Sequence, residues 1–446
     1  MKISRHRRTV PGAALVCAAL LALTACGSGG SDDGDAGGGA KDVKAALAEG
    51  GTLKVWAWEP TLKQVVKDFE AKYPKVKVQL VNSGTGDDQY KALQNAVQAG
   101  SGVPDVAQIE YFALSQFALG KSVAKLDGYG AENLKKLYSP GPWNSVDING
   151  SVYALPMDSG PMALFYNKKV FDKYGISVPA TWDAYLDAAR KLHKADPKAY
   201  IASDVGDAGL TTSMIWQAGG HPYRVDGTKV GVDFGDAGTA RYTGVWQKLV
   251  SEHLLAPVKG WTDQWYKGLG DGTIATLPAG AWMPANFTSG VASASGDWRA
   301  APLPQWAEGE HASAENGGSS LALMQAGKEK DLAYGFLEYA NKDAGVRTRI
   351  DGGAFPATTA DLDSREFQDR AFPYFDGQRA NRIFARSAKD VRTGWSYLPF
   401  QVYANSVFGD TVGKAYVSST PLSQGLKAWQ DASVKYGKEQ GFTVGG

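Results

Sequence analysis

The segment 53–110 alternates between strand and helix patterns, and this alternation limits the fold more than any other feature of the sequence. The strand patterns are short apolar or alternating runs, and the helix patterns carry apolar residues three and four positions apart. The predicted elements are a strand over 53–58, a helix from 62 that ends at Pro74, a strand over 76–80, a helix over 87–98 and a strand over 105–110. Strands that alternate with helices form a parallel sheet with right-handed crossovers, so we expect an α/β fold.

The ends of the first and third strands are the first candidate binding positions. In a parallel sheet, ligands lie beyond the carboxyl ends of the strands. Trp58 and Glu59 follow the first strand, and Glu110 and Tyr111 follow the third. We therefore expect both pairs to face one crevice.

The first 25 residues have the pattern of a secretory signal. Basic residues at positions 2, 5, 7 and 8 precede an apolar stretch from about 13 to 25. This stretch is shorter than the roughly 20 apolar residues that a membrane-spanning helix needs. We therefore expect a cleaved signal peptide over 1–25 and a protein that works outside the cytoplasm.

Leu-Thr-Ala at 23–25 followed by Cys26 resembles the lipobox of bacterial lipoproteins. The resemblance implies that Cys26 is diacylated and that the chain is cut just before it. Residues 27–39 are almost entirely Gly, Ser and Asp, and a flexible segment of that length reaches about 20 Å. We expect 26–50 to form a lipidated cysteine with its tether, anchored on the outer face of the cell membrane. An ordinary cleaved signal is the alternative.

The rest of the chain has a nearly balanced charge. Without residues 1–25 it keeps 43 basic and 46 acidic side chains and no second cysteine besides Cys26. No disulfide is therefore expected, and the balance gives no reason to expect a nucleic-acid partner. The sequence shows no Gly-x-Ser-x-Gly, P-loop or His-Glu-x-x-His motif, so we expect neither catalysis nor a cofactor. Isolated histidines also argue against a metal site; beyond the signal they are His193, His221, His253 and His311.

Further patterns continue the mixture of strands and helices after 150. The expected strands or extended segments cover 163–166, 200–203, 273–277, 300–304 and 319–324. The expected helices are 181–193 capped by Thr181, 211–218, 236–254 capped by Asp236, and 421–436 with Pro421 at its first position.

A series of short motifs resembles the extracytoplasmic sugar-binding proteins of ABC importers, including maltose- and trehalose/maltose-binding proteins. Each motif is weak alone, but their shared order spans nearly the whole mature chain. The motifs are Val-Pro-Asp-Val at 103–106, Val-Tyr-Ala-Leu-Pro at 152–156, Phe-Tyr-Asn-Lys at 165–168, Pro-Ala-Thr-Trp-Asp at 179–183, Gly-Ala-Trp at 280–282, Ala-Pro-Leu-Pro at 301–304 and Gly-Gly-Ser at 317–319.

The resemblance implies a periplasmic-binding-protein-like fold, in which two α/β lobes are joined by a multi-segment hinge with the ligand cleft between them. The implied lobes are 51–155 with 305–355, and 158–300 with 360–446. The implied crossings lie near Pro156–Gly160, Pro302–Pro304 and Gly352–Thr358. Proline and glycine suit segments that must absorb a hinge motion.

A sugar offers flat C–H faces to aromatic rings and a rim of hydroxyls to polar groups. The resemblance places a stacking indole at Trp282, and Trp58 is the second candidate. Trp216 is expected in the core instead. The other aromatic candidates are Trp261, Trp265, Phe355, Trp395 and Tyr397.

Acidic side chains are the expected partners of the sugar hydroxyls, because a charged hydrogen-bond acceptor binds a hydroxyl strongly. Glu110 matches the acidic residue of the family, followed by Asp158 and Glu59. The remaining candidates of this site are Tyr111, Gly318 and Ser319. Some relatives carry an aromatic residue where Ser319 stands, so the sugar's identity is left open.

The resemblance implies a monomeric, membrane-anchored receptor that binds a neutral di- or oligosaccharide and delivers it to the permease of an ABC importer. A separate subunit would hydrolyse ATP. Two alternatives stay open. The same fold could bind a polyamine, a peptide or a ferric ion, or Glu110 and Asp158 could be the paired carboxylates of a glycosidase.

Overall fold

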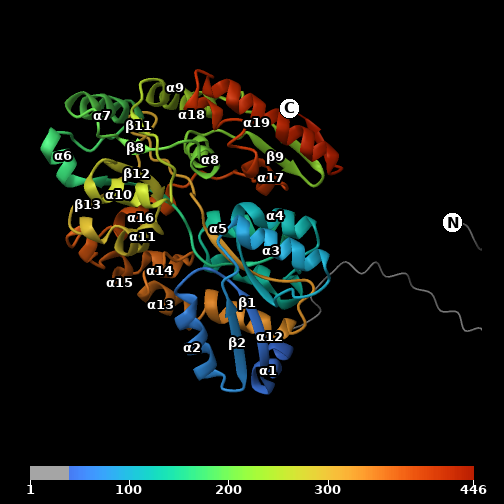
Figure 1. Cartoon of the computed structure of the whole chain (residues 1–446). Helices are drawn as coiled ribbons and strands as arrows, with labels where there is room; N and C mark the ends of the chain where they lie inside the picture. Colours follow the sequence, from blue (N-terminus) through green and yellow to red (C-terminus); the bar gives the residue numbers. More distant parts are fainter. Residues whose placement is uncertain (1–39, 446) are drawn as a thin grey trace, which may run out of the picture. The chain divides into compact units, whose positions relative to one another are not determined.

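The computed structural model describes residues 40–445, and its first sheet contains the predicted strands of the segment 53–110 (Figure 1). The strand order is β2-β1-β3-β14-β6. β1 runs parallel to β2 and β3, as predicted, whereas β14 runs antiparallel to β3 and β6. The strands are β1 (Gly51–Trp56), β2 (Val76–Val81), β3 (Val106–Glu110), β6 (Leu155–Pro156) and β14 (Ser319–Leu323).

The strand order places a crevice between β1 and β3. The chain passes from β1 to β2 and then back to β3 on the other side of β1. Because such crossovers are right-handed, α2 (Leu62–Lys72) and α3 (Asp87–Gln98) cover opposite faces of the sheet. The reversal opens a crevice at the carboxyl ends of β1 and β3, where Trp58 and Glu110 stand.

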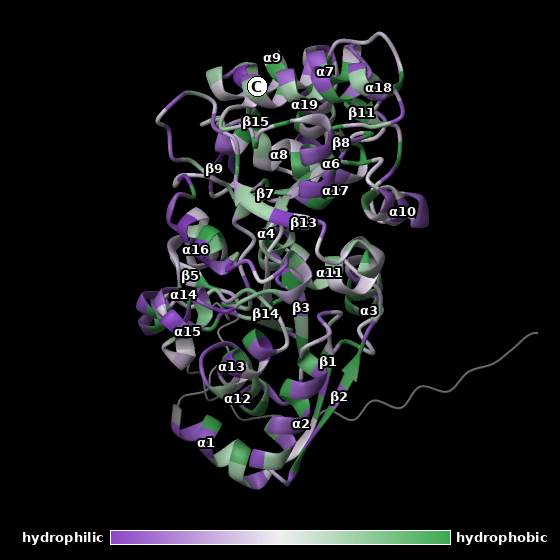
Figure 2. Cartoon of the chain, turned by 90° about the vertical axis from the view of Figure 1, so that its left-hand side faces the viewer, coloured by the Kyte–Doolittle hydropathy of each residue, from purple (hydrophilic) through white to green (hydrophobic). Residues whose placement is uncertain are grey.

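The first core lies between this sheet and its helices. Leu53, Val55 and Ile109 are fully buried in it, and Figure 2 shows the hydrophobic colour of β1 and β2 in this region. The strands thus bury the side chains that the apolar pattern selects. The other helices of this lobe are α4 (Tyr111–Leu119), α5 (Pro140–Val146) and α12 (Lys330–Asn341), and a short hairpin pairs β4 (Asp147–Ile148) with β5 (Ser151–Val152).

The C-terminal end of the predicted tether is a helix. α1 (Ala40–Glu49) packs against α12, with Val43 buried in the first core. Leu47 is packed so close to Gly335 of α12 that a Cβ there would lie 3.0 Å from it. The prediction of a tether over 26–50 is therefore wrong for 40–49, because two apolar residues four positions apart give this segment one packing face. Cys26, the signal peptide and the Gly-rich segment 27–39 lie outside the described residues.

The second lobe is built on several small sheets. The sheet next to the crossings has three antiparallel strands in the order β12-β7-β13. These are β7 (Met162–Asn167), β12 (Thr276–Gly280) and β13 (Trp298–Pro302). The others are β8 (Ala202–Ser203) with β11 (Leu255–Ala256), and β9 (Tyr223–Asp226), β10 (Lys229–Val232) and β15 (Thr443–Gly445).

Strand β7 separates two further cores. Met162 and Leu164 belong to the second core, and Ala163 and Phe165 belong to the third. Successive side chains of a strand point to opposite faces, so one buried strand serves both cores. The helices of this lobe are α6 (Lys168–Tyr174), α7 (Trp182–Ala195), α8 (Ala208–Gln217), α9 (Ala237–Ser251), α10 (Asp263–Asp271), α11 (Met283–Gly290), α14 (Thr359–Asp363), α15 (Arg365–Gln368), α16 (Asn381–Lys389), α17 (Gln401–Ser406), α18 (Lys414–Val417) and α19 (Leu422–Glu439).

The predicted helix caps are confirmed at two positions. The Thr181 hydroxyl accepts a hydrogen bond from Ala184 N, and the Asp236 carboxylate accepts one from Thr239 N. Pro421 differs slightly, because its extended backbone makes it the N-cap of α19 rather than the first helical residue.

The chain crosses between the first core and the others at 158–161 and 315–320. The second crossing was predicted near Pro302–Pro304, but residues 305–314 stay in the second lobe. Gln305 pairs with Thr181 and Ser313 with Val391. These bridges hold the segment there, and no pattern in the sequence marks them.

The remaining crossing follows α13 (Ala344–Asp351), which packs on α2 and α12 of the first lobe. Ala340 and Ala357 lie in the first core, whereas Val346, Ile350 and Phe355 lie in the third. The prediction of 305–355 as one piece of the first lobe is therefore wrong for 305–314, whereas α13 stays packed on the first lobe with its apolar face in the third core.

Candidate functional site

A pocket of about 300 Å³ lies between the lobes at the carboxyl end of β3. We call it the Trp282 pocket. The first lobe contributes Glu110 and Phe112, and the second lobe contributes most of the rest. The second-lobe and crossing residues that define it are the loop 203–207, the N-terminus of α8, Trp261, Trp265, Trp282, the crossing residues 316–318, Tyr397, Gln401 and Asn405.

Trp282 is fixed to the second crossing. It lies two residues after the end of β12, and its Nε1 donates a 2.6 Å hydrogen bond to the carbonyl oxygen of Asn316. A Cβ on Gly280 would lie 2.3 Å from that Nε1 and 2.5 Å from the same carbonyl oxygen. Glycine at 280 is therefore what lets the indole reach the crossing and still line the pocket.

Trp261 presents a second indole beside the first. Its side chain is 54% exposed, and its ring lies 5.7 Å from that of Trp282 with the planes 30° apart. Its backbone is left-handed, with φ +67°, a conformation that costs a bulky residue about 1–3 kcal/mol. Trp265 is buried beneath it at 5.1 Å between ring centroids, so it supports Trp261.

Two acidic side chains line the Trp282 pocket. Glu110 accepts a 2.9 Å hydrogen bond from the hydroxyl of Tyr90, which itself accepts one from Glu110 N. Asp204 is buried and accepts hydrogen bonds from Trp246 Nε1 and the Tyr416 hydroxyl. Burial raises the pKa of Asp204 to about 6. Sequence reasoning missed Asp204, although its place just after strand β8 is a signal of the same kind that selected Glu110.

Trp58 stands at the end of β1, but it does not line the Trp282 pocket or the second pocket, around Trp395. Its half-buried ring lies edge-on to Tyr90, 6.3 Å away, and its backbone N–H donates to Gln108 Oε1. The ring is therefore near Glu110 through Tyr90 rather than beside Trp282. A ligand role for Trp58 stays a prediction.

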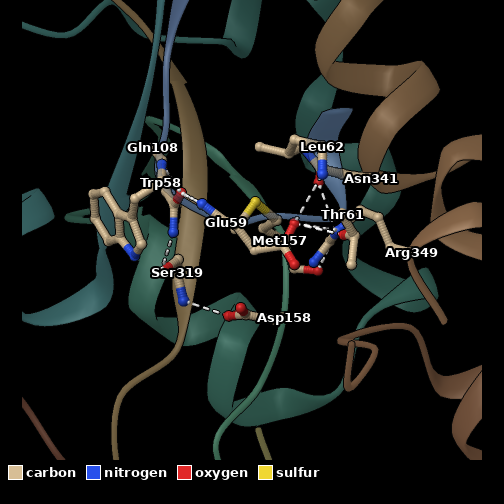
Figure 3. A network of polar contacts seen from close by, with 10 residues as sticks. All are labelled: Trp58, Glu59, Thr61, Leu62, Gln108, Met157, Asp158, Ser319, Asn341 and Arg349. Carbon is tan, nitrogen blue, oxygen red and sulfur yellow. Dashed lines mark hydrogen bonds and ion pairs between the residues drawn. The ribbon is translucent and has the colours of Figure 1, made fainter. Parts of the chain in front are cut away.

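Glu59 caps helix α2 (Figure 3). Its carboxylate accepts hydrogen bonds from Thr61 Oγ1 at 2.5 Å and Leu62 N at 3.2 Å. It also lies 4.0 Å from Nε of Arg349, a buried side chain whose Nη1 donates to Met157 O. These contacts hold α2 and α13 against the first crossing, and Glu59 lines neither pocket.

Two carboxylates hold the crossings together. Asp158, on the first crossing, accepts a 2.6 Å hydrogen bond from Ser319 N on the second (Figure 3). Glu315, on the second crossing, accepts 2.5 and 2.9 Å bonds from Gly160 N and the Ser159 hydroxyl on the first. Burial raises the pKa of each carboxyl to about 7. Asp158 thus lies in the hinge, and Glu315 was not found from the sequence because nothing local distinguishes it.

Tyr111, Gly318 and Ser319 also build the hinge. The Tyr111 hydroxyl donates a 2.6 Å hydrogen bond to the carbonyl oxygen of Asp158, and burial raises its pKa well above the usual range. Gly318 has φ +102°, and a Cβ there would lie 2.6 Å from the Tyr111 ring. The Ser319 hydroxyl accepts from Gln108 Nε2. Of these residues, Gly318 lines the Trp282 pocket.

The remaining aromatic candidates lie in two places, Phe355 in a core and Trp395 with Tyr397 at a second pocket. Phe355 is buried in the third core against Phe367. Trp395 stacks on Trp216, with ring centroids 5.0 Å apart and planes 7° apart. The pair lines a second pocket of about 390 Å³, which we call the Trp395 pocket, and Tyr397 lines both pockets. Trp216 is buried, as predicted.

Residues 40–445 contain no group of three or more His, Cys, Asp or Glu side chains that could hold a metal ion. Within the same range, no helix has the length and apolar character needed to cross a membrane.

The sequence of residues 57–347 matches the family model for bacterial extracellular solute-binding proteins. That match covers well over half of the chain and includes both sides of the Trp282 pocket. The chain belongs to this family. As a solute-binding protein, it has its pocket between two α/β lobes.

Solved structures of other solute-binding proteins share this fold. The ABC transporter associated binding protein from B. animalis subsp. lactis Bl-04, solved in complex with beta-1,6-galactobiose, is 46% identical with a TM-score of 0.83, covering 89% of this chain and 99% of that one. The galacto-N-biose-/lacto-N-biose I-binding protein from Bifidobacterium longum is 24% identical with a TM-score of 0.78, covering 89% and 99% of the two chains.

One relative known from its sequence aligns with nearly the whole of this solute-binding protein. The lactose-binding protein of Rhizobium radiobacter is 25% identical over 97% of this chain and 98% of its own length. The arabinooligosaccharide-binding protein of Bacillus subtilis is 26% identical over 62% of this chain and 65% of its own.

Proposed function

We propose that this solute-binding protein captures a short β-galactoside in the Trp282 pocket and delivers it to the permease of an ABC importer. The observation that carries the proposal is the pairing of two neighbouring indoles, Trp282 and Trp261, with the carboxylate of Glu110 in one pocket. Indole rings suit the C–H face of a sugar, and a carboxylate suits its hydroxyls.

The substrate class rests on what three relatives bind. Their names or structures mention lactose, beta-1,6-galactobiose and lacto-N-biose, and each of these disaccharides contains a β-linked galactose. The relative with 46% identity carries the galactobiose, so we place a β-1,6-linked galactoside first. Arabino-oligosaccharides are the second candidate, because another relative is named for them.

The contacts can supply a useful affinity. A hydrogen bond to a charged group contributes about 1.5–3 kcal/mol. A few such bonds and one or two aromatic contacts reach about −8 kcal/mol, a micromolar dissociation constant, after the ordering costs.

Both lobes line the pocket, so a bound sugar favours the closed arrangement. Glu110 comes from the first lobe and the indoles from the second. A ligand shifts a hinge equilibrium only when it binds one state better, and contacts to both lobes provide that difference. We infer that the closed, monomeric form then docks both lobes on the permease.

A panel of thermal-unfolding measurements tests the substrate class. The panel contains β-1,6-galactobiose, lactose, lacto-N-biose, arabinobiose, maltose and spermidine. We expect the galactosides to raise the free energy of unfolding most, because they are the proposed ligands. A ligand at 100 times its dissociation constant adds about 2.7 kcal/mol to that free energy. Stabilisation by spermidine alone would contradict a sugar ligand, and release of free galactose during incubation would reveal a hydrolase instead.

We also propose that the protein is a lipoprotein anchored through Cys26 after removal of residues 1–25. The support is the lipobox-like sequence before that cysteine. Cys26→Ser is expected to release the protein from the membrane fraction, because no acyl chain can then be attached. Immunoblots of membrane and soluble fractions measure this, with Cys17→Ser as the matched control; retention of the Cys26→Ser protein in the membrane would contradict the anchor.

A further inference from the structure

Tyr397 stands between two pockets of the inter-lobe cleft. The Trp282 pocket has a volume of about 300 Å³ and the Trp395 pocket about 390 Å³. Each is lined by residues of both lobes. Among residues 40–445, Tyr397 alone lines both pockets.

Tyr397 is held in this place from several sides. It packs against both the first and the second core, and its ring lies edge-on to Trp216 at 6.4 Å and to Trp395 at 6.1 Å. Burial raises the pKa of its hydroxyl, and the charges of Glu315 and Glu110 raise it further. The side chain is therefore a neutral, fixed wall rather than a loose surface group.

The Trp395 pocket also combines aromatic and polar side chains, although its charged lining is Asp147, Lys389 and Arg392 rather than mainly carboxylates. The parallel indoles of Trp216 and Trp395 form one wall. The first lobe adds the hydroxyls of Ser115 and Ser145 and the amide of Asn144. Aromatic faces beside hydroxyls and amides are what a saccharide needs, so the space beyond Tyr397 suits sugar rings.

We propose that Tyr397 is a specificity-determining residue that sets the length of the ligand by closing the Trp282 pocket against this second, sugar-compatible space. A volume of about 300 Å³ is at the lower end for small-molecule sites and matches one or two sugar rings. Longer chains would have to pass the tyrosine ring. The inference rests on the proposed function, because it concerns the same pocket and the same class of ligand.

Isothermal titration of three proteins with β-1,6-galactobiose, -triose and -tetraose tests the proposal. If the thermal panel selects another disaccharide, its own longer homologues are used. The wild type is expected to bind the disaccharide at least tenfold more tightly than the tetrasaccharide. Tyr397→Phe keeps the ring and should keep this ratio, whereas Tyr397→Ala removes it and should shrink the ratio at least tenfold.

A double variant asks whether the second pocket receives the longer chain. Adding Trp395→Ala to Tyr397→Ala should remove most of the gained tetrasaccharide affinity. If Tyr397→Ala does not fold, Tyr397→Leu keeps apolar packing on both cores with a shorter side chain and takes its place, with thermal unfolding as the check.

The outcomes separate this inference from the proposed function. Equal wild-type affinity for the di- and tetrasaccharide, or an unchanged ratio in the shortened variant, would overturn the role of Tyr397 while leaving sugar binding intact. Failure of every saccharide to bind the wild type would overturn both.

Discussion

Trp282 combines two contacts in one side chain. Its Nε1 holds the carbonyl oxygen of Asn316 on the second crossing, and its ring lines the pocket beside Trp261. A ligand stacked on this ring would therefore contact a side chain that is hydrogen-bonded to the hinge. Sequence reasoning selected Trp282 by resemblance, and the structure adds the reason why it stands where it does.

Trp282→Ala is expected to weaken sugar binding at least tenfold, or about 1.4 kcal/mol, because it removes one of the two neighbouring indole rings that line the pocket. Trp282→Phe keeps a ring but loses the bond to Asn316 O, so we expect a smaller loss. Titration calorimetry measures both, with the exposed Val417→Ala as the control. An unchanged affinity in Trp282→Ala would refute the stacking role.

At the scale of elements, the end of β12 is what positions the pocket. The strand delivers Gly280 against the second crossing so closely that no other residue fits without displacement. The crossing in turn needs Gly318 in a left-handed conformation to clear Tyr111. Glycines here serve close packing between segments, not chain flexibility.

Gly280→Ala is expected to lower both stability and sugar affinity. The added Cβ would lie 2.3 Å from Trp282 Nε1, so the indole must move, and such overpacking costs about 1–3 kcal/mol. Gly244→Ala on α9 is the matched control, because no atom lies within 4 Å of its added Cβ and alanine favours a helix. Denaturant unfolding and calorimetry compare the two; equal behaviour would contradict this account.

At the scale of the whole molecule, the two lobes are joined by reciprocal carboxylate contacts. Asp158 and Glu315 each accept hydrogen bonds from the opposite crossing, and burial raises the pKa of each to about 7. Their pKa values in the unfolded chain are about 4. Between these values the folded protein binds more protons than the unfolded chain, so its free energy of unfolding rises as the pH falls from 8 to 5.

Glu315→Gln should flatten this pH dependence, because one of the groups that take up a proton is removed while an acceptor oxygen remains for Gly160 N. Asp158, and Asp204 with a pKa of about 6, keep the remaining slope in the same direction. Urea unfolding of the wild type and the variant between pH 5 and 8 measures the difference. Identical slopes would show that Glu315 is already ionised throughout this range.

The sequence alone determined the features that local spacing encodes. Apolar periodicity between 53 and 110 predicted the parallel strands β1–β3 and their helices, because each element buries the face its own pattern marks. The place of Glu110 at a strand end predicted that it faces the crevice, and it lines the pocket there. Their short polar side chains predicted Thr181 and Asp236 as helix caps, and both accept the expected hydrogen bonds.

Tertiary structure decided which side chains meet. Glu59 was expected at the sugar rim but caps α2, and Phe355 was expected in the cleft but lies in a core. The contacts that define the hinge join residues about 155 to 161 positions apart, such as Glu315 with Gly160 and Asp158 with Ser319. Local patterns report only how a segment buries its own face, so they hold no information about partners that packing brings together from so far along the chain.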